Sequence, residues 1–123
     1  MKFRDYFNND FATQEMHYLP SLRTRYYRCR TEEAMEAVKR ISKKWDAKIR
    51  YIDDARHEII FDTRNFSATA TIVSPMMTET AVDWNVSTSK ILPLGKGKKI
   101  IEELYKQLDS ILQFKAVSLY HSR

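Results

Sequence analysis

The spacing of apolar and polar residues predicts two helices, one on each side of a strand-rich middle. The first follows Thr31, which suits an N-cap, and acidic residues stand in its first turn, where the helix dipole favours them. Its apolar positions, three or four residues apart, are Ala34, Val38, Ile41 and Trp45. The second helix is expected to begin near Gly97 and to end at about Phe114. Its apolar stripe consists of Ile100, Ile101, Leu104, Leu108, Ile111 and Leu112.

Strand-like runs fill the region between the helices, at residues 47–52, 57–63, 66–73 and 79–88. The last two alternate between apolar and polar residues, which is typical of a sheet with one buried face. Short gaps between successive runs favour hairpins, so we predict an antiparallel sheet. An extended, aromatic-rich segment at residues 21–30 precedes the first helix and predicts a further strand.

These elements give the order β-α-β-β-β-β-α: an α+β fold with an antiparallel sheet of four or five strands and both helices on one face. In element order, residues 20–114 resemble a single repeat of the TATA-box-binding-protein-like fold. The resemblance is one of topology and carries no functional residue of that family to this chain. A helix-grip fold, in which a long C-terminal helix closes a curved sheet around an apolar ligand, is similar at this level.

The length of 123 residues fits one domain with a substantial core. We assign that domain to residues 19–114. Residues 1–18 are an aromatic N-terminal arm that must pack on the domain or on a partner, and residues 115–123 are a C-terminal tail. Hydrophobic residues make up 43% and charged residues 30% of the chain, a balance typical of soluble globular proteins.

Composition also bears on the compartment. No run approaches the roughly 18 apolar residues of a membrane-spanning helix, and the first residues lack the apolar stretch of a secretory signal. The single cysteine, Cys29, cannot form an internal disulfide, and a lone strand cysteine is more often a small core residue than a nucleophile. We expect a cytoplasmic protein without membrane contact.

Positive charge is concentrated in two segments of a chain whose net charge is +5. One is the segment that leads into the second helix, with Lys96, Lys98 and Lys99 around two glycines. Cations oppose the dipole at a helix N-terminus, so three lysines there are unfavourable unless an anion such as phosphate binds. The alternative is a flexible loop whose lysines point into water.

The other basic segment is the first extended run, in which Arg23, Arg25, Arg28 and Arg30 are interleaved with tyrosines. Arginine beside tyrosine suits phosphate contact and base stacking. Strand alternation places Arg23 and Arg25 on the face of Cys29, and Arg28 and Arg30 on the opposite face. The four therefore cannot all contact one ligand. The alternative is an edge strand whose charges prevent pairing with other chains.

The sequence shows no catalytic constellation. A cluster of acids and one histidine surrounds a turn, at Asp53, Asp54, His57, Glu58 and Asp62. Its spacing matches no metal motif, and we interpret it as solvated turn chemistry. We predict no catalytic residues, no metal site and no cofactor.

Three hypotheses about function follow. The leading one is a small non-enzymatic binding domain for a polyanion, either nucleic acid or a phosphate-bearing ligand, or for a protein partner. The second is a homo-oligomeric assembly protein that associates through residues 1–18. The third is a carrier of an apolar ligand with a helix-grip fold.

Overall fold

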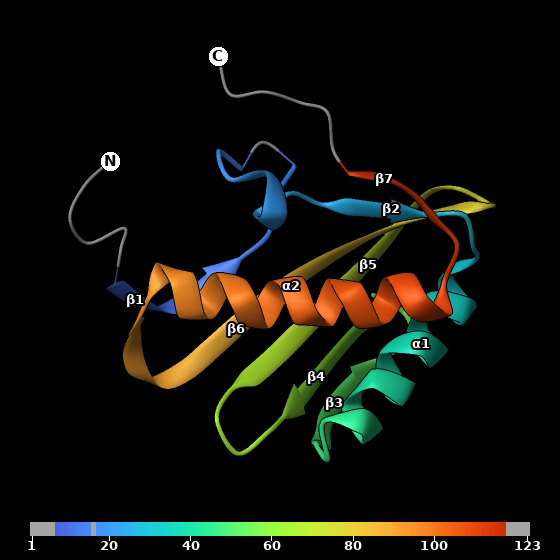
Figure 1. Cartoon of the computed structure of the whole chain (residues 1–123). Helices are drawn as coiled ribbons and strands as arrows, with labels where there is room; N and C mark the ends of the chain where they lie inside the picture. The colour runs from blue at the N-terminus through green and yellow to red at the C-terminus, as the bar shows by residue number, and fades with distance from the viewer. Residues whose placement is uncertain (1–6, 16, 118–123) are drawn as a thin grey trace.

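A computed structural model of the chain describes residues 7–15 and 17–117. One antiparallel sheet is crossed on a single face by two helices, which confirms the α+β class (Figure 1). The elements are β1 (Phe7–Ala12), the short 3-10 helix η2 (Pro20–Leu22), β2 (Arg25–Tyr27), α1 (Thr31–Lys44), β3 (Lys48–Asp53), β4 (Glu58–Asp62), β5 (Ser67–Met76), β6 (Glu79–Pro93), α2 (Leu94–Ile111) and β7 (Phe114–Val117).

The expected count of four or five strands is wrong, because the sheet has seven strands within the described residues. The additional strands are β1 and β7, which come from the segments assigned to the arm and the tail. The sheet order is β3-β4-β5-β6-β2-β7, and β1 also pairs with β6, so the TATA-box-binding-protein-like order is not confirmed. Residues 1–6, 16 and 118–123 of those segments lie outside the described residues.

The first extended segment also differs from the expectation. Residues 21–30 form a strand only at Arg25–Tyr27, because Pro20 starts a 3-10 turn before it. Helix α1 follows as predicted, but its N-cap is Arg30, and Thr31, which the pattern predicted as the N-cap, is the first residue of the helix.

The longest strand, β6, lies at the centre of the sheet. Its 15 residues extend beyond the predicted run at 79–88. One edge pairs with β5, from Ser67 opposite Ser87 to Met76 opposite Glu79. The other edge is divided between β2, which pairs with Thr80–Val82, and β1, which pairs with residues 85–93. Asp83 stands where one partner strand gives way to the other.

The core lies between the helices and the sheet. From α2, Ile101, Leu104 and Leu108 are fully buried, so the predicted apolar stripe does face the sheet. They meet a layer of strand residues that are equally buried: Ile59, Phe61, Ala68, Ala70, Ile72, Val82, Trp84 and Val86. Helix α1 packs mainly on β3, β4 and β5, whereas α2 packs on β1 and β6 (Figure 1).

Helix α2 begins at Leu94, three residues earlier than predicted, so Gly95 and Gly97 lie inside it. Gly97 is buried against the Phe11 ring of β1. A Cβ atom at position 97 would stand only 2.4 Å from that ring, a distance that no side chain tolerates. A Cβ atom at position 95 would meet nothing within 4 Å. The absence of a side chain at Gly97 therefore lets α2 approach β1 closely.

We expect Gly97→Ala to destabilise the protein by about 1–3 kcal/mol, because the methyl group must displace the buried Phe11 ring. Gly95→Ala is the matched control and should be neutral or stabilising by up to about 1 kcal/mol, since alanine favours the helix. Urea unfolding of both variants measures the difference. Equal effects of the two substitutions would contradict the close packing of α2 on β1.

A buried polar junction joins β1, β2, β6 and α2. The hydroxyls of Thr13 and Thr24 both donate to Asp83 Oδ1, at 2.6 and 2.7 Å. The backbone N–H of Trp84 donates to Thr13 Oγ1 at 2.8 Å. From α2, the Tyr105 hydroxyl donates to the Val82 carbonyl at 2.8 Å. Burial raises the pKa of the Asp83 carboxyl above its ordinary value, and the two hydroxyl donors only partly offset that rise.

We expect Asp83→Ala to cost about 1–3 kcal/mol of stability, because it leaves the hydroxyls of Thr13 and Thr24 without their shared acceptor. Asp83→Asn keeps an oxygen acceptor and should cost less at neutral pH.

The difference in stability between the wild type and Asp83→Asn should also depend on pH, and the raised pKa of Asp83 determines the direction of that dependence. A raised native pKa means that the folded state holds the Asp83 proton more tightly than the unfolded state. As pH rises from the ordinary value of 3.8 through the native pKa, the wild type should therefore lose stability relative to Asp83→Asn. Urea unfolding at a series of pH values measures this. Parallel stability profiles for the two proteins would show that Asp83 is not buried at this junction.

Candidate functional site: a basic hollow at the end of the sheet

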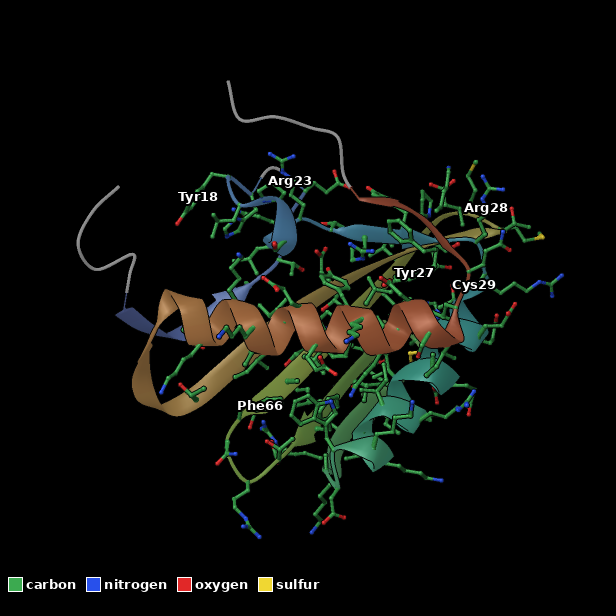
Figure 2. The ribbon with its side chains drawn as sticks, in the orientation of Figure 1. Tyr18, Arg23, Tyr27, Arg28, Cys29 and Phe66 are labelled. Carbon is green, nitrogen blue, oxygen red and sulfur yellow. The ribbon has the colours of Figure 1, made fainter. Side chains whose placement is uncertain are left out.

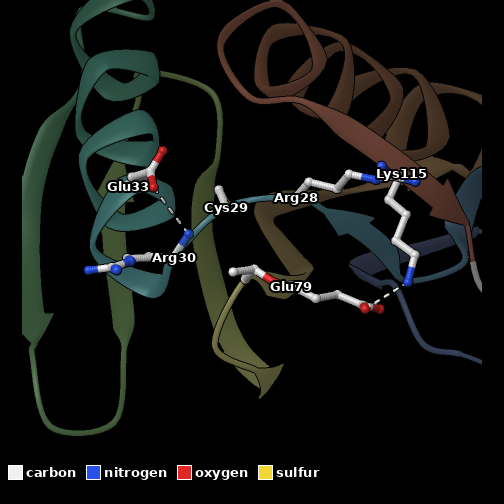
Figure 3. A pocket seen from close by; sticks show the side chains of 7 residues that line it. Arg28, Cys29, Arg30, Glu33, Glu79 and Lys115 are labelled. Carbon is white, nitrogen blue, oxygen red and sulfur yellow. Dashed lines mark hydrogen bonds and ion pairs between the residues drawn. The ribbon is translucent and has the colours of Figure 1, made fainter.

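A surface hollow of about 420 Å³ lies where β2 ends, α1 begins and the β5–β6 turn meets β7 (Figure 3). Its walls come from segments far apart in the sequence. The lining residues are Arg28, Cys29, Arg30, Glu33, Thr78, Glu79 and Lys115.

Hydrogen bonds hold the backbone of the hollow on two sides. The Arg28 N–H donates to the Gln113 carbonyl at 2.8 Å. The buried Thr80 hydroxyl donates to the Cys29 carbonyl, also at 2.8 Å. Cys29 itself is 5% exposed, which confirms it as a core residue, whereas Arg28 and Arg30 are exposed. The alternation predicted for this segment thus places the two arginines on the side away from the core.

Some of the charged side chains that line the hollow form ion pairs and others do not. Glu79 forms an ion pair with Lys115, with 2.6 Å between Oε2 and Nζ. Glu33 accepts a hydrogen bond from the Arg30 backbone N–H at 3.3 Å. Among the residues that the structure describes, neither the Arg28 nor the Arg30 guanidinium forms an ion pair. Arg28 and Arg30 line the hollow from opposite sides, because the Arg28 side chain extends toward Lys115 and the Arg30 side chain extends away from it (Figure 3).

Arg25 lies elsewhere and is engaged in the fold. Its Nη2 atom stands 2.8 Å from Asp109 Oδ2, and its guanidinium lies 4.0 Å from the centre of the Phe114 ring. The Tyr27 hydroxyl donates to the other oxygen of Asp109 at 2.7 Å. Burial, reinforced by that hydrogen bond, raises the pKa of Tyr27 strongly. Arg25 and Tyr27 together attach β2 to the C-terminal end of α2.

The other predicted anion contacts are also separated from the hollow. Arg23 donates from Nε to the His17 carbonyl at 2.8 Å, and it lies beside Tyr18, well apart from Arg28 (Figure 2). Lys96, Lys98 and Lys99 lie at the N-terminal end of α2, whereas the hollow is lined by Lys115, which follows the opposite end of that helix. Since α2 has 18 residues, about 27 Å of helix separates its two ends. Lys98 pairs with Glu102 at 3.3 Å.

Of the seven predicted cations, the structure thus brings only Arg28 and Arg30 to one hollow. It adds Lys115, which sequence reasoning missed because residue 115 was assigned to a tail. The sequence contained one indication of this residue's role: Lys115 directly follows the apolar Phe114 at the end of the predicted second helix.

Cys29 is the residue with a nucleophilic side chain among those that line the hollow, and that side chain is buried. Burial raises the pKa of the Cys29 thiol, which disfavours the reactive thiolate. The acidic turn between β3 and β4 behaves as predicted, since Asp53 Oδ1 accepts the backbone N–H groups of Ala55 and Arg56, both at 3.0 Å. Within the described ranges, no group of three His, Cys, Asp or Glu residues could hold a metal ion.

Comparisons of the chain with protein-family models, with curated proteins and with solved structures found no match. Neither helix has the length and apolar character needed to cross a bilayer, as far as the described residues go. Function must therefore be inferred from the geometry of the hollow and its surroundings.

The different roles of Arg25 and Arg28 can be tested by stability. Arg25→Ala removes an ion pair and ring packing from a side chain that is 21% exposed, and should destabilise the protein by about 1–2 kcal/mol. Arg28→Ala, at an exposed position in the same segment, should change stability by less than about 0.5 kcal/mol. Urea unfolding measures both values. A larger cost for Arg28→Ala than for Arg25→Ala would reverse these assignments.

Proposed function

We propose that the protein is a small non-enzymatic binding module that takes an anionic group, a carboxylate or a phosphate, in the basic hollow. The observation that carries this proposal is the pair Arg28 and Arg30, which line one hollow without an ion pair among the described residues. Guanidinium groups present several N–H donors in a plane and bind carboxylates and phosphates through paired hydrogen bonds.

The fixed backbone supports this proposal. Because residues 28 and 29 are hydrogen-bonded to Gln113 and Thr80, binding has to order only the ends of the arginine side chains. Lys115 adds a third cation whose own charge is balanced by Glu79. Since Glu33 also lines the hollow, its three cations face two carboxylates, and one additional negative group balances the charge.

A compact anion suits the molecule better than a long nucleic-acid strand. Extended polyanion binding requires many cations that lie along one surface, and the predicted set is split between the two ends of α2. On the face of the sheet turned away from the helices, Glu58 of β4 stands opposite Thr71 of β5, and its carboxylate would repel phosphates.

Self-association through residues 1–18 remains a prediction, for which residues 7–15, 17 and 18 provide no specific surface. Part of that segment is β1, which pairs with β6 of the same chain and buries Phe11. The opposite edge strand, β3, carries Lys48 and Arg50 and an irregular register beside Arg50, and both features discourage edge-to-edge pairing.

Binding of pyrophosphate and of a tetraglutamate peptide, followed by NMR shifts of the backbone amides, tests the proposal. We expect shifts at residues 28–30 and an affinity that falls as salt is added. Arg28→Ser combined with Arg30→Ser should weaken binding at least about tenfold, since two charge-assisted contacts are lost.

Lys43→Ser combined with Lys44→Ser is the matched control, because it removes the same charge from the far end of α1. It should leave the affinity within about twofold. The proposal is wrong if neither probe binds, or if the two double variants weaken binding equally.

A further inference from the structure

The turn between β5 and β6, next to the hollow, exposes an unusual amount of apolar surface. Val73 is 57% exposed, Met76 56% and Met77 77%. These are the most exposed large hydrophobic side chains in the described part of the chain. We call residues 73–78 the hairpin tip; in Figure 1 it reaches past the end of β2.

The hairpin tip has a defined shape. Ser74 Oγ lies within hydrogen-bond distance of the carbonyl oxygens of Met76 and Glu79, and the latter distance is 3.0 Å. Met76 stands opposite Glu79 in the strand register. The exposed methionines are therefore presented by a hydrogen-bonded turn, and their unbranched side chains can adapt to the shape of a partner.

Arg30 connects the hairpin tip to the basic hollow. A second depression, of about 290 Å³, is lined by Arg30, Thr31, Glu32, Ser74 and Met77. Since Arg30 lines both depressions and Met77 lines the second, the anion site and the exposed side chain of Met77 belong to one continuous surface. A ligand that reached both would need a negative group beside a large apolar group.

We infer that this surface docks a polypeptide segment of a partner protein in which a carboxylate stands next to a large apolar side chain. The inference rests on the proposed function and names its ligand class. A free phosphate or a nucleic acid would leave the exposed methionines without a contact, whereas an acidic, apolar peptide satisfies both parts.

A peptide segment is favoured over a second copy of the chain by the size of the surface. A stable dimer buries about 20–30 residues on each side. The hairpin tip and the two depressions together involve far fewer residues than that. The surface matches a short linear segment instead.

A random peptide library displayed on phage and selected on the immobilised full chain tests this inference. We expect the enriched peptides to carry Asp or Glu beside Leu, Ile, Met or Phe. Their dissociation constants, measured by fluorescence anisotropy, should rise at least about tenfold in the double variant Met76→Ser with Met77→Ser. The variant Arg28→Ser with Arg30→Ser should weaken them by a similar factor.

Tyr51→Ser combined with Ile52→Ser provides the control, because it removes two exposed apolar side chains from β3, away from the hairpin tip. This change should leave the dissociation constants within about twofold. If the double variant of Met76 and Met77 disturbs the fold, the single variant Met77→Ser replaces it, because Met77 is the more exposed of the two. The single variant should weaken peptide binding at least about threefold.

The outcomes separate this inference from the proposed function. Peptides that need the two arginines but ignore the methionines would overturn the inference and leave the proposed function in place. Failure to enrich peptides, or enrichment of peptides without the acidic and apolar pair, would also overturn it. If no peptides are enriched, or if the enriched peptides lack the acidic and apolar pair, the pyrophosphate and tetraglutamate titrations still test the proposed function independently.

Discussion

A single carboxylate, that of Asp83, holds together the two strands that share one edge of β6. The chain leaves that edge at Thr13 and returns to it at Thr24, and both hydroxyls donate to the same oxygen. Between these points, backbone hydrogen bonds join Gln14 to Leu22 and to Thr24, which closes the loop. Leu22, 1% exposed, fills the space beneath it. Burying a carboxylate is costly, so the arrangement is stable only while its donors remain in place.

The position of the hollow follows from this junction. Because Thr24 is fixed at Asp83, β2 pairs with residues 80–82 of β6, and residues 28–30 must then emerge beside the β5–β6 turn. The contact of Arg25 and Tyr27 with Asp109 fixes the same strand to α2, and β7 closes the other side through its pairing with β2. The contacts of Asp83 and Asp109 therefore determine where Arg28, Arg30 and the exposed methionines lie, although neither carboxylate touches them in the part of the chain that the structure describes.

Much of the fold could be predicted from local pattern alone. Helix α1, strands β5 and β6 and the buried stripe of α2 all follow a clear periodicity, because each has one face in the core. Strand β3 has no fully buried residue, and it was predicted from its extended, hairpin-like run instead. Strands β1 and β7 could not be predicted in this way. Strand β7 has only four residues, and both strands pair with edges of β6 and β2 that are set by long-range contacts, which periodicity does not encode.

The candidate site was predictable only in part. Alternation around the apolar Cys29 correctly separated Arg28 and Arg30 from the core. Arg25 is surrounded by the same kinds of residues as the other arginines of its segment. Its partner Asp109 lies 84 residues later in the chain, so the local sequence cannot predict that ion pair. The lysines at the start of α2 were grouped with the arginines by charge, whereas the length of the helix separates them in space.

Amide hydrogen exchange at Thr13 and Trp84, followed by NMR, tests the central claim about the junction most directly. The Thr13 N–H donates to the Trp84 carbonyl, and the Trp84 N–H donates to the Thr13 hydroxyl, each at 2.8 Å. We expect both amides to exchange about as slowly as those in the middle of the β5–β6 pair, because they open only when the sheet unfolds. Exchange at loop rates at these two positions, while the β5–β6 amides remained protected, would contradict the account.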